Sequence, residues 1–484
     1  MKLLFVASEL APFAKTGGLA DVVAALPAEL HRAGHDVRVV VPFYDTIDTS
    51  KARFEAVVDR IDLALGTHRY QLKIFRVAPP AAGGPQLYFV HCPALYDRGR
   101  LYTSDPDEHR RFLALSYAAL MLCQRLEWSP DVVHAHDWQA AMVPMLLKTL
   151  GARDPYFRRT RSLLTIHNLG YQGSFHSNVG PDTNLDDFVT LFHQDLLKQD
   201  RINFMLQGVL YADGVSTVSP TYAAEIQTPE HGVGMDALLR RRKSTVVGIL
   251  NGVDYAEWSP DTDPHLPANY HPGDLAGKAR CKQVLVEQLG LPYVPAAPLL
   301  GIVSRLVWQK GFDLVGAVLP GILQRHGAQL VVLGSGEPDL EEMFGRLQRA
   351  FPRQVCFFRG FQNPLAHLIE AGADMFLMPS RYEPCGLNQM YSLRYGTIPI
   401  VHRTGGLADT VETWNPRTGR GTGYAFARHD AAGLRWGIES ALQAYGDDRQ
   451  WRRLMANGMA QDFSWSKQSK LYELVYDRLI AGGP

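Results

Sequence analysis

The sequence predicts an α/β protein made of two Rossmann-like, doubly wound domains with parallel sheets. Short apolar runs alternate with helix-patterned segments through the first half of the chain, and the alternation restarts after residue 298. Such runs between amphipathic helices indicate parallel strands covered on both faces. Residues 259–298 are rich in proline and poor in periodicity, which is typical of a junction. The length of 484 residues also suits two or three domains.

The first domain is predicted at residues 1–255. It opens with a strand at 2–8, a glycine-containing loop, and a helix at 20–34 that ends at a glycine. The later elements share β-branched or helix-periodic patterns. Strands are expected at 36–44, 69–78, 86–92, 131–136, 162–168 and 212–219, and a long helix at 110–126.

A linker region is predicted at 256–295 and the second domain at 296–484, with its last helix expected to pack back on the first domain. The strands of this domain are expected at 298–306, 328–336, 355–361, 373–380 and 397–403, with helices at 367–373 and 432–446. Folds of this class bind ligands at the carboxyl ends of their strands. With two facing domains, we expect a deep cleft between them to hold the site.

Charge and cysteine content narrow the function classes. Lysine plus arginine and aspartate plus glutamate both number 49, so the net charge is zero, which disfavours nucleic acid and anionic membranes as partners. The five cysteines form no CxxC pair, as expected of reduced thiols in the cytoplasm. The apolar run at 3–7 is too short for a signal peptide, and no run reaches the ~20 residues of a membrane span.

Two similar stretches, KTGGLADV at 15–22 and RTGGLADT at 403–410, raise the question of a shared function. The first follows the opening strand and begins a helix, so Lys15 and the glycine amides can cradle a phosphate. A plain tight turn with a surface lysine is the alternative. The second stretch follows a late strand of the other domain, so it is not the positional counterpart. Contact with ligand and simple shaping of the loop both stay open for it.

The counterpart in the second domain is SRLVWQKGFD, which brings Arg305 and Lys310 to the end of the first strand there. Two cations at that place form an anion site, although a solvated surface pair is the alternative. Glu383 follows another strand in PSRYEPCGLNQM, where a carboxylate can bond sugar hydroxyls or offset charge at an anomeric carbon. Cys385 has no histidine near it in sequence, so we interpret it as lining rather than as a nucleophile.

Two strands of the first domain end in VVHAHDWQ and LLTIHNLGYQG. His134 and His136 could ligate a metal, but no third ligand is nearby, and a buried structural pair is the preferred interpretation. The residues just past the strand ends combine carboxylate, aromatic and amide groups that suit a sugar. They are Asp137, Trp138, His167 and Asn168. The DxD at 261–263 lies among prolines and is not taken as a metal site.

Together these motifs give the chain a resemblance to bacterial glycogen synthases and plant starch synthases, which are retaining glucosyltransferases of the GT-B fold. KTGGLADV, HAHDWQ, IHNLGYQG, SRLVWQKGFD, RYEPCGLNQMYSLRYGT and RTGGLADT occur in the family's order and spacing over nearly the whole chain. The resemblance implies transfer of glucose from ADP-glucose to an α-1,4-glucan such as glycogen, without a metal or other cofactor. It places the acceptor with the first domain and the nucleotide sugar with the second.

The resemblance also implies a role for each matching residue. Catalysis is implied for Glu383, Lys310, Arg305, His167 and Asp137. Donor contacts are implied for Lys15, Gly17, Gly18, Arg305, Gln309, Lys310, Cys385, Gly386 and Leu387. Acceptor or sugar contacts are implied for Glu9, Tyr96, Asp137, Trp138, Asn168 and Asn251. Related transferases carry a second glutamate eight positions after the first; that position is Tyr391 here, so a two-glutamate mechanism is not implied.

These residue types suit a reaction in which ADP leaves as an anion and the sugar ring becomes positive. We expect the acceptor 4-hydroxyl to attack from the face that the pyrophosphate leaves, and domain closure to bring Lys15 to the phosphates. The alternatives are a transferase for UDP-glucose or a non-glucan acceptor, and an inactive glucan-binding protein. Oligomeric state and self-priming stay undecided at the level of sequence.

Overall fold

The structure is a computed structural model that describes residues 1–78 and 83–482, with the side chains of 186–188 left aside. The chain divides into two compact units. Unit 1 comprises Met1–Val218, Ala223–Gly252 and Trp465–Pro484, and unit 2 comprises Ser219–Tyr222 and Val253–Ser464. Each unit has its own sheet, so each is described by itself.

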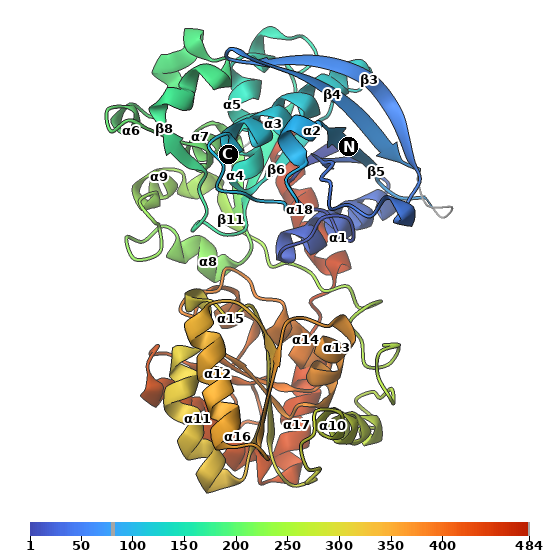
Figure 1. The fold of residues 1–484 in the computed structure, drawn as a ribbon, viewed down its shortest axis with the longest axis vertical. Helices are drawn as coiled ribbons and strands as arrows, with labels where there is room; N and C mark the ends of the chain where they lie inside the picture. The colour runs from blue at the N-terminus through green and yellow to red at the C-terminus, as the bar shows by residue number, and fades with distance from the viewer. Residues whose placement is uncertain (79–82, 483–484) are drawn as a thin grey trace. The chain divides into compact units, whose positions relative to one another are not determined.

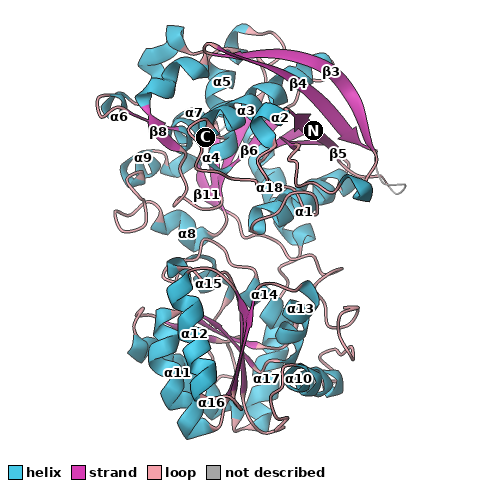
Figure 2. Cartoon of the chain, in the orientation of Figure 1, coloured by secondary structure: helices cyan, strands magenta, loops and turns pink. Residues whose placement is uncertain are grey.

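The centre of unit 1 is a mixed sheet with the strand order β11-β10-β7-β6-β1-β2-β5-β4-β3 (Figures 1 and 2). Its strands are β1 Lys2–Val6, β2 Asp36–Pro42, β3 Phe54–Leu65, β4 His68–Val77, β5 Gln86–His91, β6 Val132–His136, β7 Arg161–Ile166, β10 Gly214–Thr217 and β11 Val246–Gly248. All pairs from β11 to β5 are parallel, whereas β4 and β3 pair antiparallel. A separate small ribbon joins β8 Ser174–His176 to β9 Arg201–Asn203.

Helices cover this sheet because their apolar faces match its buried strands. They are α1 Gly18–Arg32, α2 Pro93–Tyr96, α3 Glu108–Arg125, α4 Asp137–Ala140, α5 Met142–Lys148, α6 Gln194–Leu197, α7 Phe204–Tyr211, α9 Asp236–Arg241 and α18 Trp465–Ile480, with α8 Pro220–Glu225 at the division between the units. The long helix α3 is buried over most of its circumference, and residues 111–116 are all buried. The last helix, α18, packs against α1 and β7.

Unit 2 is built on a parallel sheet with the order β14-β13-β12-β15-β16-β17. Its strands are β12 Leu299–Val303, β13 Gln329–Gly334, β14 Val355–Arg359, β15 Met375–Met378, β16 Ile398–His402 and β17 Tyr424–Phe426. Its helices are α10 Ala276–Gln288, α11 Asp313–His326, α12 Pro338–Ala350, α13 Asn363–Gly372, α14 Asn388–Arg394, α15 Gly405–Thr410, α16 Ala431–Tyr445 and α17 Asp448–Met459. Figure 1 shows α11, α12 and α16 on one face of the sheet and α10, α13 and α14 on the other, and α17 contributes buried residues to the cores on both faces.

The two Rossmann-like sheets confirm the predicted fold class, with two local differences. The hairpin of β3 and β4 adds antiparallel strands to an edge where only parallel ones were expected, because β3 was not recognised as a strand. Residues 256–295 are not a free linker. They include α10, whose buried Cys281 and Leu285 belong to the core of unit 2 beside Ile369.

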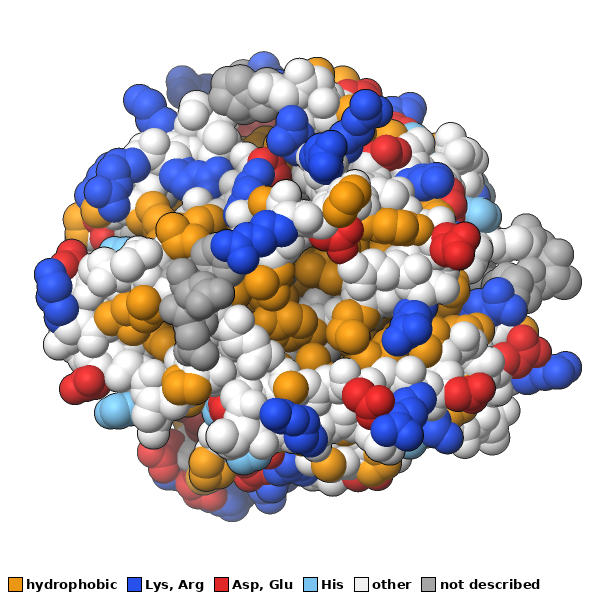
Figure 3. Space-filling view, turned by 90° about the horizontal axis from the view of Figure 1, so that it is seen from above, with side chains coloured by type: hydrophobic (Ala, Val, Ile, Leu, Met, Phe, Trp, Pro, Cys, Tyr) orange, Lys and Arg blue, Asp and Glu red, His pale blue; other side chains and the backbone are white. Residues whose placement is uncertain are grey.

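The surface agrees with the balanced charge of the sequence. On the face drawn in Figure 3, basic and acidic side chains are interspersed around a band of apolar ones. Among the residues that the structure describes, no helix is both long and apolar enough to cross a membrane.

Candidate active site

In unit 1 the loop between β1 and α1 is organised around Glu9. This carboxylate is 3% exposed and accepts hydrogen bonds from the Thr16 amide at 2.8 Å, the Thr16 hydroxyl at 2.6 Å and the Gly17 amide at 3.2 Å. The Tyr102 hydroxyl donates a fourth at 2.7 Å. Glu9 was expected to contact the acceptor. In the structure its four donors make it the anchor of the Lys15–Gly17 turn.

The turn itself presents an unobstructed backbone. Gly17 has an extended conformation, and a Cβ placed on it would meet no atom of the chain within 4 Å. A side chain here would therefore fill space into which a ligand could come close to the backbone. Gly18 starts α1, and Lys15 beside it is half-exposed, with its ammonium 2.6 Å from the carboxylate of Asp21.

Asp137 and His167 meet where β6 and β7 end. Asp137 Oδ1 accepts the backbone N–H of His167 at 2.7 Å and that of Asn168 at 3.4 Å. Burial raises the pKa of Asp137 to about 7, although these two hydrogen bonds oppose the rise. Burial also lowers the pKa of His167 to about 3, so its imidazole is neutral. Its Nε2 lies 3.0 Å from Nδ1 of His136.

Two residues predicted to touch the acceptor are largely enclosed by protein in this structure. The Trp138 ring is 9% exposed, packs edge-on to Phe112 at 4.9 Å, and lies so close to Gly173 that a Cβ there would come within 2.2 Å of it. Tyr96 is fully buried, and its hydroxyl donates to the Arg111 carbonyl at 2.8 Å. Contacts with residues from other elements enclose both side chains, and a motif match does not reveal such contacts.

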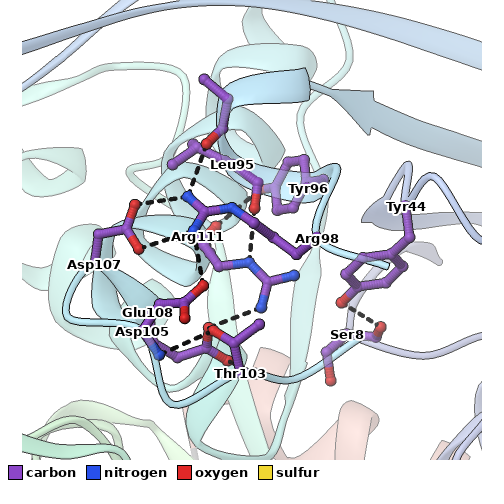
Figure 4. Close-up of polar contacts among 11 residues, drawn as sticks. Ser8, Tyr44, Leu95, Tyr96, Arg98, Thr103, Asp105, Asp107, Glu108 and Arg111 are labelled. Carbon is purple, nitrogen blue, oxygen red and sulfur yellow. Dashed lines mark hydrogen bonds and ion pairs between the residues drawn. The ribbon is translucent and has the colours of Figure 1, made fainter. Parts of the chain in front are cut away.

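Figure 4 shows the polar surroundings of Tyr96. It lies beside Arg111, whose guanidinium is buried and donates to the Leu95 carbonyl at 2.7 Å and to Glu108 at 2.7 Å. Glu108 in turn accepts the Thr103 hydroxyl and amide, which ties down the loop that carries Tyr102. Arg111 and Glu108 therefore hold the loop from which Tyr102 donates to Glu9.

Three further residues of unit 1, Asn168, Asn251 and His134, differ in burial and in hydrogen bonding. Asn168 is half-buried and its side-chain oxygen accepts the Gly170 amide at 3.0 Å, which shapes the turn after β7. Asn251 is 5% exposed, and its Oδ1 has no hydrogen-bond partner in the described part of the chain. His134 is buried between the Tyr476 hydroxyl and the Thr165 hydroxyl, which agrees with a structural histidine.

In unit 2 the central contact joins Lys310 and Glu383. The ammonium lies 2.6 Å from Oε2 of the carboxylate, and the Ser380 hydroxyl donates to the same oxygen at 2.9 Å. The side chains of Lys310 and Glu383 are 18% and 7% exposed. Each residue follows the carboxyl end of a strand, β12 or β15, and these strands pair in parallel. The parallel register therefore places the two loops together.

Glycine makes the approach of the Lys310 loop possible. Gly311 has a φ of +67°, and a Cβ on it would come within 2.0 Å of the Pro379 carbonyl. Gln309 is buried and its amide donates to the Tyr382 carbonyl at 3.2 Å, which joins the same two loops. Arg305 is exposed, and within the described residues its guanidinium has no ion-pair partner. It is the cation of this loop that remains available to an anion.

The backbone of the stretch RTGGLADT packs against the loop that carries Glu383. The Gly406 amide donates to the Glu383 carbonyl at 3.1 Å. A Cβ on Gly405 would come within 1.9 Å of that carbonyl, and one on Gly406 within 2.1 Å of the Cys385 carbonyl. This stretch differs from KTGGLADV, since its glycines are packed against protein and Gly17 is not.

The loop that follows Glu383 turns through Gly386, whose φ is +73°, and Leu387 precedes α14. Cys385 is 3% exposed, in line with a lining role. Asp263 of the DxD accepts from His367 and Tyr395, so that its carboxylate is used internally. Across residues 1–78 and 83–482 no three His, Cys, Asp or Glu side chains are grouped so that they could hold a metal ion.

Sequence reasoning did not single out four partners: Asp21, Tyr102, His136 as a partner of His167, and Ser380. Asp21 lies within the quoted KTGGLADV stretch and one helical turn from Lys15's loop, so a charge-pairing argument could have found it. Tyr102 comes from a loop far along the chain, and no local signal connects it to Glu9.

Known proteins resemble the chain over its full length. Residues 2–241 match the model of the starch synthase catalytic domain, and residues 294–455 that of glycosyl transferases group 1. Among curated relatives, glycogen synthase of Anaeromyxobacter dehalogenans (strain 2CP-C) is 47% identical, covering 99% of this chain and 100% of the relative. That of Streptococcus sanguinis (strain SK36) is 41% identical with the same coverage. The catalytic domain of starch synthase IV from Arabidopsis thaliana, solved with ADP and acarbose, is 35% identical with a TM-score of 0.91 over 99% of both chains.

Proposed function

The chain belongs to the glycosyltransferase family of the starch synthase catalytic domain, and we propose that it is a glycogen synthase that transfers glucose from ADP-glucose to the non-reducing end of an α-1,4-glucan. The proposal includes retention of configuration and release of ADP. The chain is 46–47% identical to glycogen synthases over 99% of its length, which supports the reaction class. The solved relative with bound ADP and acarbose supports a nucleotide and a glucan-like sugar as ligands.

The observation that carries the proposal is the Lys310–Glu383 contact beside Arg305. A nearly buried carboxylate with an ammonium at 2.6 Å places both signs of charge in one site. The transfer needs both, because negative charge develops on the leaving ADP and positive charge on the sugar ring. Arg305 supplies a second cation that is not neutralised by a carboxylate.

The residues divide the work as follows. Arg305 and Lys310 stabilise the departing pyrophosphate, and Lys15 with the Gly17 amide provides a further phosphate cradle. Glu383 holds the transferring glucose and stays a carboxylate, without forming a covalent bond to it. The acceptor 4-hydroxyl attacks the anomeric carbon from the face that ADP leaves, so the configuration is retained. The bond from that carbon to the phosphate oxygen breaks as the new bond forms, and the hydroxyl proton passes to the departing phosphate oxygen. Arginine and lysine serve in place of a divalent cation, so the proposal includes no metal.

One assay tests this function. The purified chain is given ADP-glucose or UDP-glucose labelled in the glucose, with glycogen as acceptor and EDTA present, and label in precipitated glucan is counted. We expect incorporation from ADP-glucose that EDTA does not reduce, and α-amylase should release the label. No incorporation from either donor would overturn the proposal. Incorporation from UDP-glucose alone would show that the donor is UDP-glucose and not ADP-glucose. Loss of incorporation in EDTA would show that the reaction needs a metal ion.

A further inference from the structure

His136 at the end of β6 and His167 just after β7 are joined by a hydrogen bond in which one ring must donate and the other accept. His136 Nδ1 and His167 Nε2 lie 3.0 Å apart, a hydrogen-bond distance. The parallel register sets this contact, since His136 is opposite Thr165 and His167 follows two residues later. The His136 ring is fully buried between Phe5, at 5.6 Å, and His134, at 4.1 Å between ring centroids. These neighbours leave it no room to reorient.

Both rings are neutral, because burial lowers the pKa of His136 well below its usual range and that of His167 to about 3. A neutral imidazole has one N–H and one bare nitrogen. One histidine must therefore donate in this contact and the other accept.

The second nitrogen of His136 decides which one donates. His136 Nε2 is buried and has no hydrogen-bond partner among the described residues. A proton on it would be an orphaned N–H, which costs about 1–3 kcal/mol and is rarer in proteins than an unpaired acceptor. The proton of His136 is thus placed on Nδ1, where it donates to Nε2 of His167.

We propose that His136 is a positioning residue that fixes the tautomer of His167, so that His167 presents Nδ1–H as a hydrogen-bond donor to the substrate. With Nε2 occupied as an acceptor, the proton of His167 must be on Nδ1. His167 is only partly buried, and among the described residues its Nδ1 makes no hydrogen bond and is not one of the fully buried unpaired atoms, which leaves that atom for a ligand. Asp137 of the same HAHD motif fixes the backbone of His167, so the motif sets both its main chain and its ring.

This inference deepens the proposed function and rests on it for the identity of the ligand. A fixed Nδ1–H matches a sugar hydroxyl that acts as an acceptor. It cannot take a proton from the attacking hydroxyl, so His167 would orient glucose and not serve as a general base.

The test is nitrogen NMR of the full chain labelled with ¹⁵N in histidine, with His167 assigned by loss of its signals in His167→Asn. We expect a protonated Nδ1 and a bare Nε2 for His167 at neutral pH. A proton on Nε2, or a cationic ring, would overturn the inference. The tautomer is measured without substrate, so a chain that shows the expected tautomer but makes no glucan refutes the proposed function alone.

Two substitutions separate positioning from simple packing. His136→Phe keeps a ring but removes the donor, and it should allow a proton on His167 Nε2 and lower kcat about tenfold, the worth of one neutral hydrogen bond. His136→Asn keeps an N–H near the Nδ1 position and should restore the tautomer and most of kcat. The matched control is His109→Asn, a buried histidine of the same unit whose ring bonds to Asp182, which should leave the tautomer unchanged. An unchanged tautomer in His136→Phe would contradict the role.

Discussion

At the scale of single residues, the Lys310–Glu383 pair is the contact most sensitive to losing one member. Removing one partner of a nearly buried ion pair leaves the other charge without compensation. Lys310→Met should therefore lower the free energy of unfolding by about 3 kcal/mol and glucan synthesis by at least ~10²-fold. Adding Glu383→Gln to it should restore most of the stability and none of the activity.

Urea unfolding of the single and double variants measures the first effect, and the labelled-glucan assay measures the second. Arg305→Met is the matched control, because it removes an exposed cation without an ion-pair partner in the described chain. It should lower activity while changing stability by less than about 0.5 kcal/mol. A double variant no more stable than Lys310→Met would contradict the role of the unpaired carboxylate.

Asp137 gives a pH-dependent prediction. Its pKa is about 7 in the folded chain and 3.8 for an ordinary aspartate, so the folded chain holds this proton more tightly. The resulting stabilisation is fully present below pH 3.8 and is lost as the pH rises to about 7. Asp137→Asn keeps an oxygen for the His167 amide but cannot ionise. The unfolding free energy of the wild type minus that of the variant should fall by roughly 2–3 kcal/mol between pH 5 and pH 7; parallel curves would refute the shift.

At the scale of elements, an added methyl group should affect stability in one TGG loop and donor binding in the other. Gly405 has a φ of +44° and would place a Cβ 1.9 Å from the Glu383 carbonyl, so Gly405→Ala should destabilise the chain by about 1–3 kcal/mol. Gly17 is extended and has space around it, so Gly17→Ala should leave stability unchanged and raise KM for the nucleotide sugar.

Thermal unfolding and initial rates over a range of donor concentration distinguish these outcomes. An unchanged donor KM in Gly17→Ala would remove the phosphate cradle from the site. Equal loss of stability in the two variants would contradict the difference in packing.

The elements also show what a sequence can and cannot predict. The runs before Lys15, Arg305 and Glu383 are continuous and apolar, so the strands and the loops that carry these residues could be placed in advance. The burial of Trp138 depends on Phe112 and Gly173, and Tyr96 bonds to Arg111; these residues come from other elements, which no local pattern reveals. Likewise, the prolines on either side of α10 indicated a linker, while its cysteine and leucine enter the core.

At the scale of the whole molecule, unit 1 depends on a helix that is distant in sequence. Helix α18 contributes the fully buried Tyr472 and Tyr476, and the Tyr476 hydroxyl lies 2.8 Å from His134 Nδ1. A chain that stops after Ser464 keeps both segments matched by family models, yet it should lose glucan synthesis and leave unit 1 unfolded.

Limited proteolysis followed by mass spectrometry measures this effect. Unit 2 has its own hydrophobic core, so a resistant fragment from 253–464 is expected, with rapid cleavage elsewhere. Leu474→Gln in the intact chain is the control, because Leu474 is 62% exposed and its replacement should leave both units resistant. A truncated chain with a protected unit 1 would show that α18 is dispensable.

The place of α18 also has a consequence for biosynthesis. Residues up to Gly252 leave the ribosome long before Trp465–Ile480, and unit 2 lies between them. At about 5–20 residues per second, translation of that interval takes on the order of 10–50 s. During this time the nascent unit 1 exposes the apolar surface that α18 later covers. The N-terminal half of the chain is therefore translated first and completes its fold last, and it is the part that a chaperone would need to shield.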